Sequence, residues 1–137
     1  MLHLQKLAVG IRDRAHLAEM QAARARANPP LRHLTRHAPK RAAEILAGGS
    51  IYWVIAGTMS VRQRVLAIAP ARRDDGSAGC AIELDPALVR VAARPVKAFQ
   101  GWRYLAPEQA PPDLAAGAEG EDLPPDLALA LRALALL

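Results

Sequence analysis

Positively charged side chains form the densest group of chemically versatile residues in this 137-residue chain. The segment LRHLTRHAPKR carries four of them with no acidic residue between, and two more arginines stand two positions apart further along. Arginine presents planar, paired donors that match the oxygens of a phosphate group. Aromatic rings in the second half could stack an unpaired base, at about 1–3 kcal/mol each. The predicted ligand- or nucleic-acid-binding residues are Arg32, Arg36, Lys40, Arg41, Arg62, Arg64, Trp102, Arg103 and Tyr104.

The charge of the chain is unevenly distributed, although its net charge is only +5. Residues 1–73 carry 13 Lys and Arg against 3 Asp and Glu, whereas residues 74–137 carry 5 against 10. A cationic half suits an anionic partner such as nucleic acid, a phosphorylated metabolite or an acidic protein surface. The same pattern also fits two halves that attract each other within the fold, and charge alone does not separate these interpretations.

Candidate metal ligands and nucleophiles are few. His33 and His37 have the H-x-x-x-H spacing of metal ligands on a helix. The flanking prolines favour an extended chain, in which residues four apart are ~13 Å distant, so we expect no metal site. Cys80, the single cysteine, is expected to be a buried apolar residue rather than a nucleophile. Gln63 stands among valines on an apolar face and therefore needs a buried hydrogen-bond partner. No Walker, G-x-G-x-x-G or G-x-S-x-G pattern occurs, so we assign no cofactor and no catalytic residue.

The elements that position these residues follow from hydrophobic periodicity and from proline and glycine breaks. Asp13 is the expected N-cap of the first helix, and Gly48 and Gly49 close the second. The strand after Ser50 is apolar on both faces and therefore central, while Pro70 is expected to end the next strand. The expected elements are a strand at 2–9, a helix at 13–27, an extended segment at 31–37, a helix from Pro39 to Gly48, strands at 51–56 and 59–68, a strand after a turn at 74–77, a short strand at 89–93 and an aromatic segment at 97–104.

This order of elements, with helices early and hairpins late, predicts an α+β fold. The sheet is expected to be small, mostly antiparallel and curved or barrel-like, with two helices in the N-terminal half and one at the C-terminus. We expect one globular domain at residues 1–110, a Pro/Gly-rich acidic linker at 111–124 and an amphipathic leucine-rich helix at 125–137. No run approaches the ~20 apolar residues of a membrane helix, and a lone cysteine fits a reducing compartment, so we predict a cytoplasmic protein without membrane contact.

Three uncommon strings, GGS-x-YW, VRQR and FQGWRYL, carry a resemblance to a known family. They stand within HLTRHAPKRAAEILAGGSIYWVIAGTMSVRQRVLAI and RPVKAFQGWRYLAPEQAPPDL. With these segments the chain resembles the bacterial family called domain of unknown function 1489, from LHLQKLAVG to about Leu114. The resemblance implies membership of that family but no particular activity.

A more distant similarity is to two groups of small β-barrels, the pseudouridine-synthase-archaeosine-transglycosylase (PUA) and activating-signal-cointegrator-homology (ASCH) domains. Members of these groups use a basic cleft for RNA or nucleotide-like ligands. The segment EILAGGSIYWVI has their order of helix, glycine turn and strand. It lacks the Lys-x-x-x-Arg pattern of the second group, so the similarity concerns the fold and does not carry over the ligand chemistry.

Three functions remain open from the sequence. The leading hypothesis is non-catalytic binding of RNA or a nucleotide through a basic cleft. The first alternative is a small enzyme for a phosphorylated or nucleoside-like substrate, in which Lys40 or an arginine stabilises negative charge and Glu44 or Glu108 acts as base. The second alternative is a protein-interaction adaptor or homodimer that uses the C-terminal leucine-rich helix.

Overall fold

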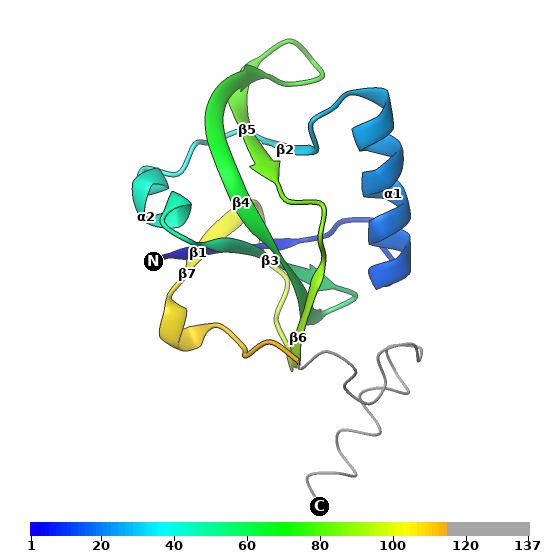
Figure 1. Cartoon of the computed structure of the whole chain (residues 1–137), viewed down its shortest axis with the longest axis vertical. Coiled ribbons are helices and arrows are strands. Elements are labelled where there is room, and N and C mark those ends of the chain that lie inside the picture. Colours follow the sequence, from blue (N-terminus) through cyan, green and yellow to red (C-terminus); the bar gives the residue numbers. More distant parts are fainter. Residues whose placement is uncertain (115–137) are drawn as a thin grey trace, which may run out of the picture.

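The structure is a computed structural model that describes residues 1–114. Two α-helices and a seven-stranded sheet make up this part of the chain, which confirms the α+β class (Figure 1). Most of the predicted linker and the whole predicted C-terminal helix lie outside the described residues. The elements are β1 (His3–Leu7), α1 (Arg14–Ala27), β2 (Arg32–Thr35), α2 (Ala42–Leu46), β3 (Ser50–Ile55), β4 (Thr58–Arg72), β5 (Ala78–Leu84), β6 (Val89–Pro95), β7 (Trp102–Leu105) and a short 3-10 helix, η1 (Pro107–Gln109).

The sheet is open and mostly antiparallel, with the strand order β2-β5-β4-β3-β1-β7. Within this order β1 and β3 are parallel, and the other neighbours are antiparallel. The long strand β4 joins the parts of the sheet, because its first half lies between β3 and β6 and its second half pairs with β5. Figure 1 shows β4 curving along the length of the sheet, with α1 on one side and α2 on the other.

The two faces of the sheet carry separate apolar clusters. The face covered by α1, here called the α1 face, includes Leu4, Trp53 and Leu17 of the helix itself. The opposite face, here called the β6 face, includes Tyr52 and Val91. Every residue of β3 is buried, so the prediction of a central strand that is apolar on both faces is confirmed.

The strand β4 continues through Pro70, so the prediction that this proline ends the strand is wrong. Pro70 lies in the half of β4 that pairs with β5. The pairings of β4 with β3 and β6 involve its first half, so among residues 1–114 the other side of β4 at Pro70 is an edge. An edge position tolerates a residue without a backbone N–H, because no neighbouring strand requires that donor.

The helix α2 begins at Ala42, three residues later than the predicted start at Pro39. The carbonyl oxygen of Arg41 accepts the first helical hydrogen bonds, so Pro39 and Lys40 stand before the helix. The double glycine ends the helix as predicted, with Gly48 in the left-handed region at a φ of 105°. Gly49 has a further reason to be glycine, since a Cβ atom there would lie 2.0 Å from the carbonyl oxygen of Leu2.

After η1 the chain returns to the sheet in a short segment, residues 111–114, here called the strap. Asp113 forms an isolated β-bridge with Val91 on β6. The backbone N–H of Ala92 donates to Pro112 at 2.8 Å, and that of Leu114 donates to Arg90 at 2.9 Å. Three of the first four residues of the predicted linker, 112–114, therefore pair with β6.

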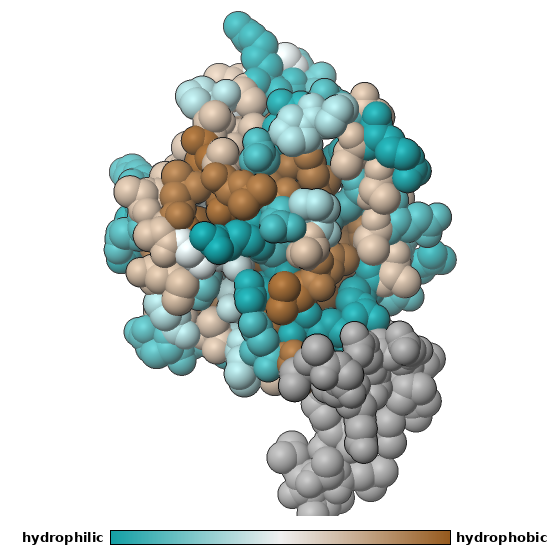
Figure 2. Space-filling model, in the orientation of Figure 1, coloured by the Kyte–Doolittle hydropathy of each residue, from teal (hydrophilic) through white to brown (hydrophobic). Residues whose placement is uncertain are grey.

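On the face that Figure 2 shows, apolar side chains reach the surface in two areas, with polar residues between them. Leu46 and Leu66 are among the exposed large hydrophobic residues of the described chain. Within residues 1–114, neither helix is long and apolar enough to cross a membrane.

Candidate functional site

Two aromatic residues of β7 fasten the loop between β2 and α2 to the sheet. The indole Nε1 of Trp102 donates to the carbonyl oxygen of His37 at 2.9 Å, and the Tyr104 hydroxyl accepts from the backbone N–H of Arg41 at 3.1 Å. The two rings meet edge to face, with their centroids 5.0 Å apart. Because β2 and β7 stand at opposite ends of the strand order, these contacts bring the ends of the open sheet together. Residues 36–41 are called the basic loop below.

The basic loop carries three cations, Arg36, Lys40 and Arg41. Arg41 lies over the Tyr104 ring, with its guanidinium carbon 5.6 Å from the ring centroid, and pairs with Glu44 through both carboxylate oxygens. Arg36 and Lys40 are exposed, and within residues 1–114 neither has an ion-pair partner. The loop therefore presents uncompensated positive charge beside two aromatic rings, which is the combination that binds phosphates and stacked bases.

The ion pair with Arg41 bears on the predicted catalytic role of Glu44. Its hydrogen bonds with Arg41 lower the pKa of the Glu44 carboxyl group. A general base works best with a pKa near neutrality, so this pairing acts against that role. Glu108, the other predicted base, is an exposed residue of η1. The surroundings of Glu44 therefore give no support to the enzyme alternative.

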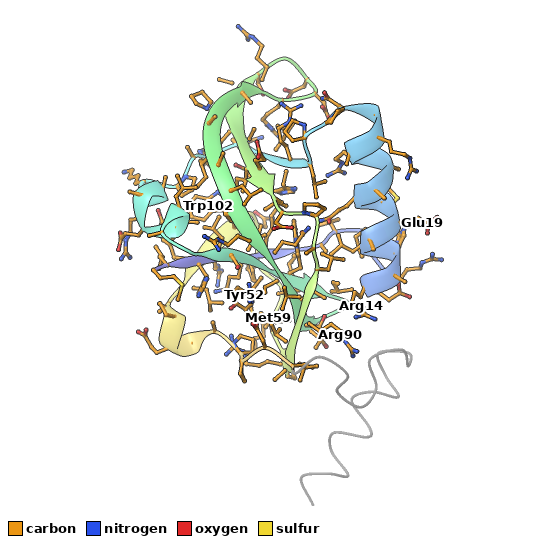
Figure 3. All side chains as sticks on the ribbon, viewed as in Figure 1. Arg14, Glu19, Tyr52, Met59, Arg90 and Trp102 are labelled. Carbon is orange, nitrogen blue, oxygen red and sulfur yellow. The ribbon has the colours of Figure 1, made fainter. Side chains whose placement is uncertain are left out.

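Arg62, Arg64 and Arg103 lie on the other side of the sheet from the aromatic pair. Strand residues alternate between faces, and the register aligns Arg103, Gln5, Tyr52 and Arg62 in one row on the β6 face. Arg103 stacks over the Phe99 ring, 4.7 Å from its centroid. The structure therefore separates these three arginines from Trp102 and Tyr104, as Figure 3 illustrates for Trp102 and Tyr52.

Arg32, the remaining predicted residue, stands on β2 as the cross-strand partner of Glu83 on β5. Opposite charges at such positions attract each other across the ladder. Of the nine predicted binding residues, five thus come together around the basic loop, whereas Arg32 lies on β2 and Arg62, Arg64 and Arg103 lie on the β6 face. The five are Arg36, Lys40, Arg41, Trp102 and Tyr104.

Arg62 is held in a polar network that attaches the strap to the sheet. Its guanidinium group pairs with both carboxylate oxygens of Asp113, at 2.7 and 2.6 Å, and donates to the Ser50 hydroxyl at 3.0 Å. The Nδ1 atom of His3 accepts from the backbone N–H of Ser50 at 3.0 Å, and its ring meets Tyr52 edge to face. Burial, and next the charge of Arg62, lower the pKa of His3, which favours the neutral ring.

This network has residue types found in nucleophilic catalysis, but their arrangement is structural. The Ser50 hydroxyl receives a hydrogen bond from Arg62, and the Nδ1 lone pair of His3 is taken by a backbone N–H. A serine nucleophile needs a base that accepts the proton of its hydroxyl. Neither contact supplies one, so we assign the group to the attachment of the strap.

Two basic residues outside the predicted binding set, Lys6 and His33, lie next to the aromatic pair. Lys6 is the cross-strand neighbour of both Trp102 and Trp53, so its side chain starts on the α1 face. The His33 ring meets Trp53 edge to face at 5.2 Å, and its Nε2 atom is buried with no hydrogen-bond partner among the described residues. The sequence held one signal for Lys6, a lysine on the otherwise apolar side of the opening strand, beside Leu2, Leu4 and Ala8.

Cys80 takes the buried position that the sequence predicts, and the two histidines do not share a helix. Cys80 is buried on β5, and burial raises the pKa of its thiol, which opposes formation of a reactive thiolate. His33 lies on an extended strand and His37 in the exposed loop that follows. Across residues 1–114, no group of three or more His, Cys, Asp or Glu side chains is placed to hold a metal ion.

Comparison with models of known families identifies the family of this chain. A family model described as "Protein of unknown function (DUF1489)" matches residues 4–137. The chain belongs to the DUF1489 family. The match continues to residue 137, so the expectation that the family resemblance stops near Leu114 is wrong. No curated protein and no solved structure gives a significant match to this DUF1489 chain.

Proposed function

We propose that this DUF1489 protein binds single-stranded RNA, or a nucleotide, without catalysing a reaction. The basic loop and the two rings of β7 form the proposed binding surface. The observation that carries the proposal is that Trp102 and Tyr104 hold the basic loop in place through His37 and Arg41. A cationic loop that is already fixed loses less conformational entropy when a ligand binds to it.

The roles of the individual groups follow from their chemistry. Arg36 and Lys40 would contact phosphate oxygens and release counterions, which supplies most of the affinity for a polyanion. The partly exposed rings of Trp102 and Tyr104 would stack bases, a contact that tolerates any sequence. Unpaired bases can reach such rings, whereas the bases of a duplex are stacked on one another, so a single strand fits this surface better.

RNA is kept as the ligand from the hypothesis drawn from the sequence, and the similarity to PUA and ASCH domains suggested by EILAGGSIYWVI carries no ligand chemistry to this chain. That similarity is part of the proposal and concerns the fold alone. The surface itself would also accept single-stranded DNA, since its contacts are to phosphates and base faces.

The test is a titration of a fluorescently labelled single-stranded RNA at several salt concentrations. The double variant Arg36→Gln, Lys40→Gln should bind more weakly, and the slope of log affinity against log salt should become shallower by about 1.4, since each lost contact to a single strand contributes about 0.7. Fluorescence of Trp102 should also be quenched on binding, because its ring would stack a base.

The matched control is Arg12→Gln, Lys97→Gln, which removes the same two residue types at exposed positions outside the basic loop. It should bind RNA like the wild-type protein. Equal losses in the two double variants would show that only net charge matters and would reject this surface. Affinity that does not change with salt would reject phosphate binding altogether.

A further inference from the structure

The side chains behind the aromatic pair form a row across the sheet. On the α1 face Lys6 lies between Trp102 of β7 and Trp53 of β3, as the strand register requires. The segment that begins with β2 spans this row, since His33 contacts Trp53 and the carbonyl oxygen of His37 accepts from Trp102. The base of the Lys6 side chain therefore stands between two indole rings, each of which also contacts the segment that begins with β2.

Two polar groups in this row lack the partners that such positions normally have. The Nε2 atom of His33 is buried and has no hydrogen-bond partner within residues 1–114. Lys6 is half-buried, and in the same part of the chain no carboxylate pairs with it. Buried polar atoms in folded proteins are almost always hydrogen-bonded, so a partner for these groups from outside the chain is chemically reasonable.

The electrostatics of the row favour an anion. Burial, followed by the positive charges of Lys6 and Arg24, lowers the pKa of His33 to about 4. Burial also lowers the pKa of Lys6. Lys6 and Arg24 therefore place positive charge near a poorly hydrated ring. No acidic group contributes to the pKa shift of either His33 or Lys6. An anionic oxygen would replace the hydration that the Lys6 ammonium group loses on burial.

We propose that Lys6 and His33 form a subsite for a terminal phosphate, behind the ring of Trp102. This inference rests on the proposed function and names the part of the ligand that enters the fold. Lys6 would pair with the phosphate, and His33, in the tautomer with its proton on Nε2, would donate to a phosphate oxygen. Because His33 Nε2 is buried, a ligand would have to reach it with one of its ends, whereas an internal phosphodiester continues as a chain on both sides.

The experiment compares the same single-stranded RNA with a phosphate or a hydroxyl at its end, tested at the 5′ and the 3′ end in turn, with the full chain. Wild-type protein should prefer one of the phosphorylated ends by about tenfold or more, the usual range for a charge-assisted hydrogen bond. Lys6→Met keeps an unbranched apolar side chain and should abolish this preference. Lys97→Met, at an exposed position, is the matched control and should keep the preference.

A second measurement locates the phosphate. Inorganic phosphate and uridine monophosphate are added in separate titrations, and the His33 imidazole is followed by NMR. A bound phosphate should raise the pKa of His33 above its value of about 4, and it should do so in wild type but not in Lys6→Met. An effect of uridine monophosphate alone would identify a free nucleotide as the source of the phosphate, whereas an effect of both would identify the phosphate group itself.

The outcomes separate this inference from the proposed function. Equal affinity for phosphate and hydroxyl ends in wild type, or a preference that survives in Lys6→Met, overturns the subsite even if the basic-loop variant still weakens RNA binding. If RNA does not bind but uridine monophosphate shifts the pKa of His33, the subsite stands and RNA binding is rejected. No response of His33 to either phosphate compound overturns the assignment of His33 to the subsite.

Discussion

The side-chain amides of Gln21 on α1 and Gln63 on β4 exchange two hydrogen bonds, 2.8 and 2.7 Å long, in the interior of the fold. Gln63 is fully buried, and its remaining capacity is used by the indole Nε1 of Trp53 at 2.8 Å and the carbonyl oxygen of Asp85 at 3.1 Å. The prediction that Gln63 needs a buried partner is therefore confirmed. This pair connects the helix to the long strand with a specificity that apolar contacts lack.

Replacing Gln63 with Leu should destabilise the protein by about 2–3 kcal/mol, because the buried Gln21 amide and Trp53 N–H would lose their partner. Urea denaturation measures this change. The double variant Gln21→Leu, Gln63→Leu should cost less than the sum of the single variants, since it removes both halves of the amide pair. Gln100→Leu, at an exposed position, is the control and should change stability by less than about 0.5 kcal/mol. Strictly additive losses would show that the two amides are not coupled.

Protonation of His33 should make stability depend on pH. Its folded-state pKa of about 4 lies below the ordinary 6.5, so the unfolded chain binds a proton first as the pH falls. The contribution of His33 to the free energy of unfolding is complete above pH 6.5 and is lost between pH 6.5 and about 4. A shift of this size corresponds to on the order of 3 kcal/mol.

His33→Phe keeps a ring against Trp53 and should flatten this loss when unfolding free energies are measured by urea denaturation between pH 7 and 4. His37→Phe is the matched control, because that ring is exposed, and its profile should follow wild type. His3 also has a lowered pKa and contributes in the same direction in all three proteins, so only the difference between profiles is diagnostic. An unchanged profile in His33→Phe would contradict the assignment.

The two glycines after α2 should respond very differently to alanine. A Cβ at Gly49 would lie 2.0 Å from the carbonyl oxygen of Leu2 and 2.6 Å from that of Ile45, and backbone atoms cannot move aside cheaply. Gly49→Ala should therefore cost about 3 kcal/mol or more. Gly48→Ala meets only the Met1 sulfur at 3.6 Å and should cost about 1 kcal/mol through its φ of 105°. Thermal unfolding of both variants measures the difference, and equal costs would contradict the close approach at Gly49.

Local features of the fold were predictable from neighbouring residues alone. Asp13 caps α1 by accepting from the backbone N–H of His16 at 2.7 Å, and its position before the helix was sufficient to predict this. The turn at 74–77 joins β4 to β5, as its Asp, Gly and Ser residues indicate. Gly48 and Gly49, by contrast, look equivalent in the sequence, and only the position of Leu2 distinguishes them.

The candidate site could be predicted only in part, because it depends on contacts between distant residues. Alternation along β4 correctly puts Arg62 and Arg64 on one face, but it does not reveal that Asp113, 51 residues later, pairs with Arg62. Likewise the basic loop was visible as a run of cations, while its attachment to Trp102 spans 65 residues. Lys6 was missed because a lysine among the apolar residues of the opening strand does not reveal that an indole ring lies on either side of it.

The hydrogen bond from Trp102 to His37 should control how well the basic loop binds RNA. Trp102→Phe keeps an aromatic ring but removes the indole N–H, so hydrogen exchange of the backbone amides at residues 37–41 should accelerate. RNA affinity should fall by about threefold to tenfold, since a neutral hydrogen bond contributes about 0.5–1.5 kcal/mol. Tyr52→Phe, on the β6 face, is the control and should affect neither measurement. If Trp102→Phe binds RNA as wild type does while its loop exchanges faster, then a fixed loop is not required, and the contact on which the proposed function rests has no role in binding.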